Sequence, residues 1–142
     1  MSEDIFEVEL EDVYHYRLSY GGQSAFFHGL QNKQLVASRC SGCGFVWIPL
    51  RPVCSKCYSD AKKIVLSGYG EILTSVPLQS PPDHLKHLKS MIASTLVLPE
   101  GADTCLKAFA VVGESGLQKG TRVKAHFLKD VGTIADFYFA PA

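Results

Sequence analysis

The amino-acid sequence predicts a mainly β protein in which a short N-terminal helix and a rubredoxin-like zinc ribbon precede a five-stranded OB-fold barrel. Three observations lead to this fold class. Two Cys-x-x-Cys pairs lie between residues 39 and 58, five short β-prone segments separated by turn residues follow residue 63, and the residues after Ser24 carry apolar side chains at helical spacing.

The cysteine pairs predict a closed metal site. Cys40 and Cys43 are separated by two residues, as are Cys54 and Cys57, and ten residues lie between the pairs. A Cys-x-x-Cys turn directs two thiolates to one point, so two such turns across a hairpin complete a tetrahedron of sulfur around Zn²⁺. Four thiolates leave no open coordination position, so we expect the zinc to be structural. Iron suits the same tetrahedron and remains the alternative metal.

Other roles for the cysteines fit the sequence less well. A redox pair needs one Cys-x-x-Cys at a strand-to-helix junction, and the repeated paired spacing argues against it. Disulfides are disfavoured because residues 1–12 are acidic, whereas a secretion signal would be basic and then apolar. The fifth thiol, Cys105, lies in an apolar alternating segment, and we expect it to be a small buried hydrophobe.

Length and composition limit the architecture. A chain of 142 residues suffices for one ordinary core with a small metal-stapled module. We assign residues 1–36 to an acidic extension and helical arm, 37–62 to the zinc ribbon and 63–142 to the barrel. With 46% apolar residues and no long apolar run, the chain is expected to be soluble, cytoplasmic and without a membrane span.

Charge is distributed unevenly along the chain. The formal net charge is zero, but the first twelve residues hold six acids and no Lys or Arg, which leaves an excess of six positive charges on the remainder. That excess is scattered. It suits a phosphate-bearing ligand better than duplex nucleic acid, which usually requires a dense basic stripe.

An arm and a short helix are predicted before the ribbon. We expect residues 1–12 to form a solvated tail. The apolar residues from Tyr14 to Tyr20 alternate with polar ones, which predicts a short strand or an extended arm with an aromatic face. Ser24 is the expected helix N-cap, and Phe26 and Phe27 lie on one side of about two helical turns. Such a helix needs a surface to pack on, either the zinc module or a partner.

The ribbon loop raises two open questions. Residues 34–39 and 45–48 are β-prone and flank the first cysteine pair. Trp47 is expected to pack as a lid on the metal site, with an exposed contact role as the alternative. For Arg51, a contact with a ligand or partner and a structural role in the loop are equally favoured.

Five segments after residue 63 predict a closed Greek-key barrel, with a sandwich as the alternative. The expected strands are 70–78, 91–98, 104–112, 121–128 and 133–139. Gly68 and Gly70 mark the point where a long first strand would bend.

The segment that begins at Ser80 predicts a short helix across the first connection of the barrel, with Ser80 as N-cap and Pro81 at the first helical position. His84 and His87 lie three residues apart on it, and we expect surface histidines rather than a second metal pair. Among the acids, only Asp136 lies in an apolar run, where we expect a backbone amide or a partner's arginine to satisfy it. Because no catalytic motif is present, a binding or scaffold subunit is favoured over an enzyme.

The order of motifs resembles a known family. The helix S-A-F-F-H-G-L, the knuckles R-C-x-x-C-G and P-x-R-P-x-C-x-x-C, and G-x-G-E-I-L-T-S-V at the start of the barrel are similar to the zinc-ribbon and OB-fold acyl-CoA-associated family, long catalogued as a domain of unknown function. The likeness covers about residues 14–142. Members often carry Pro-Pro-Arg before the second knuckle, where this chain has Pro49-Leu50-Arg51. The acidic extension has no counterpart in the pattern.

The resemblance implies a small non-catalytic partner of a thiolase-fold enzyme such as a thiolase, an acyltransferase or a thiolase-like aldolase. It would form a hetero-oligomer and help to shape or cover an acyl-CoA site. The surplus of aromatic residues before the ribbon predicts a partner interface, for which the candidates are Tyr16, Tyr20, Phe26, Phe27 and Trp47. The candidate contacts to CoA phosphates are Arg51, Lys86 and Lys89. The alternative function is a single-stranded nucleic-acid-binding module, which the low number of basic residues on the barrel strands disfavours.

Overall fold

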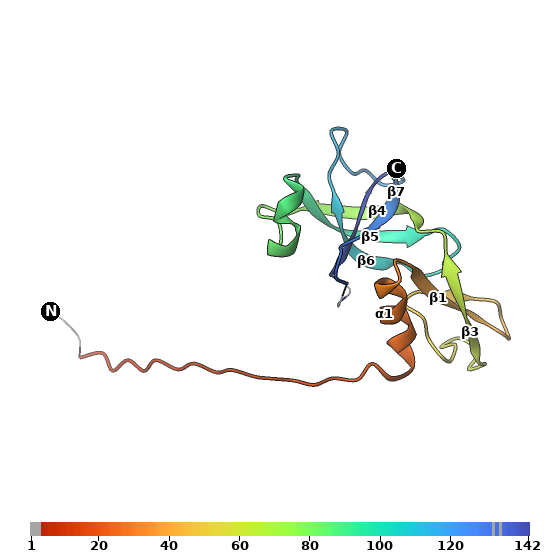
Figure 1. Ribbon diagram of the computed structural model, residues 1–142, viewed down its shortest axis with the longest axis horizontal. Coiled ribbons are helices and arrows are strands. Elements are labelled where there is room, and N and C mark those ends of the chain that lie inside the picture. Colours follow the sequence, from red (N-terminus) through yellow and green to blue (C-terminus); the bar gives the residue numbers. More distant parts are fainter. Residues whose placement is uncertain (1–3, 132, 134) are drawn as a thin grey trace.

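The computed structural model describes residues 4–131, 133 and 135–142. The chain forms an extended arm, a helix against a three-stranded ribbon, and a closed barrel beyond the ribbon (Figure 1). Among the described residues, no helix is long and apolar enough to cross a membrane. The elements before the barrel are η1 (Gly21–Gln23), α1 (Ser24–Gln31), β1 (Leu35–Cys40), β2 (Val46–Trp47) and β3 (Ala61–Leu66). Those of the barrel are β4 (Tyr69–Pro77), η2 (Asp83–Leu88), β5 (Ile92–Pro99), β6 (Leu106–Val111), β7 (Arg122–Phe127) and β8 (Phe137–Pro141).

The barrel has the predicted five strands, in the order β4-β5-β6-β8-β7, and it closes through pairing of β4 with β7. All pairs are antiparallel except β6 with β8. This Greek-key closure confirms the OB-fold type and excludes the sandwich. The first strand bends where its register with β5 shifts between Ile72 and Thr74, just after the two glycines that predicted a bend.

The last strand differs from its prediction. It begins at Phe137 and not at residue 133, because Asp136 ends the preceding turn. The Asp136 carboxylate accepts a hydrogen bond from the Thr133 amide at 2.8 Å. A backbone amide thus satisfies this half-buried acid, as the sequence led us to expect. Residue 134, inside the predicted strand, and residue 132, just before it, lie outside the described residues.

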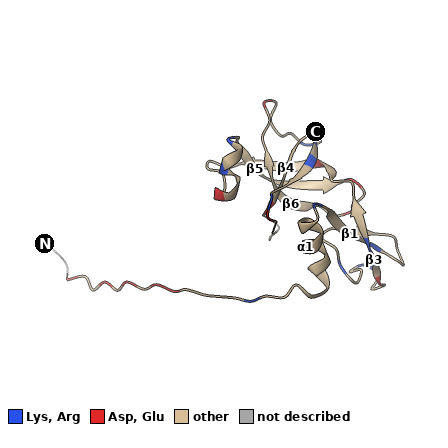
Figure 2. Cartoon of the chain, in the orientation of Figure 1, with Lys and Arg blue, Asp and Glu red and all other residues tan. Residues whose placement is uncertain are grey.

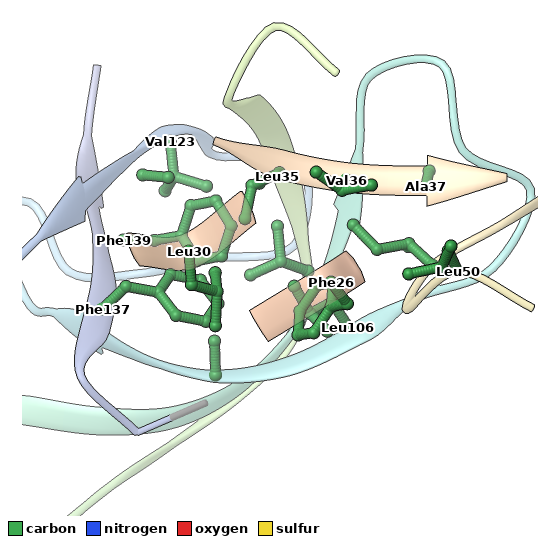
Figure 3. Packing of buried hydrophobic residues seen from close by; sticks show 14 of the residues in the cluster. Phe26, Leu30, Leu35, Val36, Ala37, Leu50, Leu106, Val123, Phe137 and Phe139 are labelled. Carbon is green, nitrogen blue, oxygen red and sulfur yellow. The ribbon is translucent and has the colours of Figure 1, made fainter. Parts of the chain in front are cut away.

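The helix packs between the ribbon and the barrel, where all three share one hydrophobic core. Phe26 and Leu30 are fully buried and belong to the same cluster as Phe137 and Phe139 of β8 (Figure 3). On its other side the helix crosses β1 so closely that a Cβ placed on Gly29 would lie 2.2 Å from Val36 Cγ2. Only glycine permits this approach. The packing surface of the helix is therefore a core that joins the ribbon to the barrel.

Three expectations for local structure need correction. Ser24 is the first residue of α1 and not its N-cap, because its hydroxyl donates to the Gly21 carbonyl at 2.6 Å and leaves the helix amides uncapped. The element after Ser80 is a 3₁₀ helix whose N-cap is Pro82, without a side-chain cap. Cys105 is exposed, because β6 begins at Leu106 with that side chain turned inward.

The loop between β5 and β6 fixes the ribbon to the barrel. The Asp103 carboxylate accepts the Val46 amide at 2.9 Å, and the Asp103 amide donates to the Val46 carbonyl at 3.0 Å. The hydroxyl of the next residue, Thr104, accepts the Ile48 amide at 2.9 Å and donates to the Ile48 carbonyl at 3.0 Å. Because these bonds join β2 to a barrel loop, the metal ribbon and the barrel hold one relative position.

Candidate metal centre

The ribbon sheet brings the two knuckles together. β1 is central, with β2 and β3 antiparallel on either side, and it ends at Cys40. The first knuckle turns back after Cys40, where the Gly44 amide donates to the Cys40 carbonyl at 3.1 Å. Gly44 has a φ of +76°, a left-handed conformation that glycine adopts without strain. The second knuckle repeats the turn, because the Tyr58 amide donates to the Cys54 carbonyl at 2.9 Å.

The four cysteines converge in space. Their sulfur atoms all lie within 4.8 Å of one another, with Cys40 Sγ 3.2 Å from Cys57 Sγ and Cys43 Sγ 3.7 Å from Cys54 Sγ. A zinc–sulfur bond of about 2.3 Å in a tetrahedron places sulfurs about 3.8 Å apart. The arrangement therefore fits a four-coordinate metal ion with no position left for substrate. Zinc is the metal that this donor set and the ribbon fold favour.

Backbone amides surround the sulfurs. Cys40 Sγ accepts the amides of Gly42 at 3.3 Å and Cys43 at 3.4 Å, and Cys54 Sγ accepts the Lys56 amide at 3.4 Å. Such bonds stabilise negative charge on sulfur, which four thiolates around a divalent ion carry in excess.

Trp47 supplies a side-chain donor to the same site. Its indole Nε1 donates to Cys54 Sγ at 3.4 Å, and its ring is half-buried. The expected packing role at the metal site is thus present. Phe45 lies against the indole with ring centroids 4.7 Å apart. The indole that contacts the site thus belongs to β2, on the opposite side of β1 from β3.

The thiols differ in acidity. Desolvation raises the pKa of Cys54, but the hydrogen bonds from the Trp47 indole and nearby amides outweigh it and lower the pKa to about 6. The Ser59 hydroxyl and amide lower the pKa of Cys57. The Phe45 amide acts to lower the pKa of Cys43, but desolvation and the neighbouring thiols raise it to about 11. Cys43 therefore holds its proton at neutral pH, and a metal ion must displace that proton to bind this thiol.

Two cations lie over the aromatic pair. The guanidinium of Arg51 is 4.7 Å from the centroid of the Trp47 ring, and Lys56 Nζ is 4.2 Å from the centroid of Phe45. Arg51 also donates to the Ser55 hydroxyl at 2.7 Å, and its own amide donates to the buried Ser38 hydroxyl at 2.8 Å. Arg51 thus has a structural role in the loop while its side chain remains at the surface.

The other predicted contact residues do not join this site. Lys86 and Lys89 lie on and just after η2, which Figure 2 shows at the far end of the barrel from the ribbon. Lys86 pairs with Asp83 at 2.5 Å. His87 is exposed, as expected, but His84 is half-buried against Phe109 with ring centroids 5.9 Å apart. Among the described residues, the four cysteines form the only cluster of side chains that could hold a metal ion.

The four candidate interface residues that precede the ribbon divide into three groups. Tyr16 and Tyr20 are exposed on the extended arm, which does not form the alternative strand. Phe27 is half-buried and packs on Tyr20 with ring centroids 4.1 Å apart. Phe26 has no accessible surface, so its assignment to an interface is wrong. The helical period could not separate the two phenylalanines, because both fall on the apolar side of a short helix.

Sequence reasoning missed the residues that hold the site in place. Asp103 looked like an acid in a solvated turn, Thr104 like the first residue of a predicted strand, and Ser38 like an ordinary strand residue. The one sequence signal for such a residue was Ser38, a polar residue in an otherwise apolar strand segment, and its side chain is buried in the structure.

Comparison with known proteins supports the ribbon assignment. The model of a family described as ChsH2, rubredoxin-like zinc ribbon domain, matches residues 27–62. Two curated relatives are each called a DUF35 domain-containing scaffold protein. The one from Methanothermobacter thermautotrophicus is 31% identical over 77 residues, 53% of this chain and 58% of the relative. The one from Methanocaldococcus jannaschii is 39% identical over 71 residues, 48% of this chain and 50% of the relative. The chain thus spans about half the length of these relatives.

Two solved structures share the fold. The Ltp2-ChsH2(DUF35) aldolase superposes with a TM-score of 0.67 at 20% identity, covering 89% of this chain and 98% of that chain. A protein of unknown function from the DUF35 family of Sulfolobus solfataricus superposes with a TM-score of 0.63 at 17% identity, covering 86% and 87%. The family model, the scaffold relatives and the shared fold confirm the resemblance identified from the sequence.

Proposed function

We propose that this chain is a non-catalytic, zinc-binding accessory subunit that docks on a thiolase-fold catalytic subunit and helps to shape or cover its acyl-CoA site. One observation carries the proposal. From residue 4 to residue 20 the chain is an extended arm (Figure 1). The arm places a series of large apolar side chains in solvent. They are Ile5, Phe6, Val8, Leu10, Val13, Tyr14, Tyr16, Leu18 and Tyr20. A continuous apolar surface of this kind is typical of a protein interface.

The arm has the pattern of a strand that lacks a sheet. Phe6, Val8 and Leu10 alternate with glutamates, and Tyr14, Tyr16 and Leu18 alternate with polar residues. In an extended conformation these side chains share one face, and the acids of residues 4–12 share the other or flank it. The arm therefore suits a partner surface that offers an apolar groove with basic residues along its edge.

The base of the arm continues the same surface onto the folded part of the chain. Leu18, Tyr20 and Phe27 line a hollow of about 310 Å³ beside α1. We propose that the partner covers this hollow together with the arm, and that Trp47, whose ring is half-exposed at the ribbon surface, lies near the edge of the contact.

The names of similar proteins agree with a partner role. The two curated relatives are called scaffold proteins, and one similar structure is named as an aldolase that includes a ChsH2 (DUF35) component. The acyl-CoA part of the proposal rests on the resemblance and on surface cations. Arg51 on the ribbon, and Lys86 with Lys89 beyond it on the barrel, would serve as two separate groups of phosphate contacts.

Co-expression with a thiolase-fold protein from the same organism, followed by size exclusion, tests the proposal. We expect one complex at micromolar concentration, with acyl-CoA turnover that the isolated chain lacks. Separate elution of the two proteins would refute the docking. Turnover by the chain alone, abolished by one point substitution in it, would refute the non-catalytic role.

A further inference from the structure

A row of aromatic side chains crosses the outer face of the barrel, away from the metal centre. Phe109 on β6 is the direct neighbour of Tyr138 on β8, and Tyr138 is the direct neighbour of His126 on β7. In each strand the flanking residues are turned into the barrel core, so these three side chains point outward. We call this set the outer aromatic row. The row includes the imidazole of His126, which the sequence analysis did not connect to Phe109 or Tyr138.

The rings of the row lie in contact with further aromatic groups. His126 stacks on Tyr138 with ring centroids 5.5 Å apart and planes at 14°. His84 reaches Phe109 from η2, edge-on at 61°. His84 forms no hydrogen bond with another described residue, and its Nε2 is buried without a partner. No hydrogen bond is therefore lost if the His84 ring shifts to admit a flat molecule beside Phe109.

The charge around the row favours an anion. The four strands β5, β6, β7 and β8 contain no Asp or Glu. Lys107 lies two residues before Phe109 on the same face and has no ion pair with a described residue. Lys124 lies two residues before His126. A hollow of about 210 Å³ opens beside Phe109 and Lys107, lined also by Ser94, Ala108 and Ala135.

We propose that this face binds a purine nucleotide, with the base stacked on the outer aromatic row at Phe109 and a phosphate on Lys107. Aromatic side chains on a sheet face bind bases by stacking, whatever the base. In five-stranded barrels of this type, the face formed by the second and third strands, with the loops beside it, is the usual ligand surface. Those strands are β5 and β6 here. Arg122, on the same face of β7, pairs with Glu100 at 3.3 Å. Lys107 and Lys124 have no such acid partner among the described residues, so the face suits one or two phosphates and not the backbone of a nucleic acid strand.

This inference is independent of the proposed complex. Coenzyme A contains an adenine nucleotide, so it would supply the ligand if the proposed function holds, and free nucleotides would supply it otherwise. A test on the isolated chain with ADP requires no partner. Failure to bind ADP therefore leaves the docking experiment unaffected, and failure to dock leaves the nucleotide site unaffected.

ADP titration followed by amide NMR and by calorimetry tests the site. We expect ADP to shift the amides of Ser94, Lys107 and Tyr138, and pyrophosphate to bind at least tenfold more weakly than ADP. Phe109→Leu should weaken ADP binding about tenfold, because a branched aliphatic side chain keeps the packing but cannot stack. Lys107→Gln should weaken it and reduce its dependence on salt.

Matched variants on the ribbon serve as controls. Tyr58→Leu removes an exposed ring and Lys62→Gln an exposed cation, and neither should change ADP affinity. Unchanged affinity in Phe109→Leu, or amide shifts confined to the ribbon, would overturn the proposal. Equal binding of pyrophosphate and ADP would overturn the stacked base. An adenine strand of nine nucleotides that binds more than tenfold more tightly than ADP would overturn the assignment to a single nucleotide.

Discussion

Gly44 and Tyr58 occupy the same position in the two knuckles. Each lies four residues after the first cysteine of its pair and donates its amide to that cysteine's carbonyl, at 3.1 Å for Gly44 and 2.9 Å for Tyr58. Both are left-handed, with φ of +76° and +61°. Glycine adopts this conformation freely, whereas tyrosine is strained there by roughly 1 kcal/mol. The two turns thus have one backbone geometry and different intrinsic stability.

This difference predicts opposite effects of two substitutions. Tyr58→Gly should raise the free energy of unfolding of the zinc-loaded protein by several tenths of a kcal/mol, since relief of strain exceeds the greater entropy of unfolded glycine. Gly44→Ala should lower it by about 1 kcal/mol. Denaturant unfolding at fixed zinc concentration measures both. Lys56→Gly, at a position without a left-handed backbone, is the control and should lower the free energy of unfolding. A rise in that free energy would contradict the explanation by backbone strain at Tyr58.

The four-cysteine centre predicts one zinc ion per chain. Cys40→Ser should lose the metal, whereas Cys105→Ser should retain it, because Cys105 is exposed and outside the cluster. Elemental analysis of the purified variants measures this. Loss of zinc should also lower the melting temperature of the barrel, because Val46 and Ile48 of the ribbon belong to the shared core. Equal metal loss in both variants would contradict the assignment.

The indole of Trp47 should tune the affinity of the site. Trp47→Phe keeps an aromatic ring but removes the donor to Cys54 Sγ. Partners that hydrogen-bond a ligand atom typically contribute about 10- to 100-fold to metal affinity, so we expect a loss of that order. Competition with a chromophoric chelator measures it. Tyr58→Phe, an exposed aromatic change on the second knuckle, should leave the affinity unchanged, and an equal loss in both variants would speak against the hydrogen bond.

Zinc affinity should rise with pH. The pKa of Cys43 is raised to about 11, so this thiol is protonated at neutral pH and must release its proton when the metal binds. Each proton released makes affinity about tenfold stronger per pH unit. The pKa of Cys54 is lowered to about 6, so this group adds a further proton only below that pH, and the dependence should steepen there. Chelator competition across about pH 5 to 8 tests both slopes; a flat profile would contradict them.

Local patterns predicted most of this fold because they report local forces. Paired cysteines identify the knuckles, and alternation identifies the barrel strands, since each strand buries one face. The prediction of Ser24 as the helix N-cap was wrong because its hydroxyl donates to the preceding Gly21 carbonyl and not to a helix amide. The residue type alone does not determine which of these groups the hydroxyl contacts. The prediction that Cys105 is buried was wrong because β6 starts at Leu106, one residue after the apolar run begins.

Contacts between distant segments could not be predicted from such patterns. The sequence offers no sign that Asp103 would accept the Val46 amide, or that Phe26 would lie in a core with Phe139. Nor does it show Phe109 beside Tyr138, because that neighbour relation depends on the parallel pairing of β6 with β8. These features depend on the closure of the barrel and on the position of the ribbon against it, and both bring together residues far apart in the sequence.

The burial of Phe26 and the exposure of the arm predict different outcomes for two kinds of variant. Leu18→Ser and Tyr16→Ser should weaken the complex with the thiolase-fold subunit at least tenfold, because truncation of an interface anchor costs on the order of 2 kcal/mol. The same variants should leave the melting temperature of the isolated chain unchanged, since Leu18 and Tyr16 are 75% and 77% exposed. Phe26→Ala should instead destabilise the isolated chain by about 3–5 kcal/mol, because it opens a cavity in the shared core.

Val65→Ser, an exposed apolar residue on β3, is the control for the arm variants. It should change neither the affinity for the partner nor the melting temperature of the isolated chain. Size exclusion of the co-expressed proteins and thermal unfolding of the isolated chain measure the two effects. If the arm variants bind the partner as tightly as the native chain does, the arm is not the docking surface.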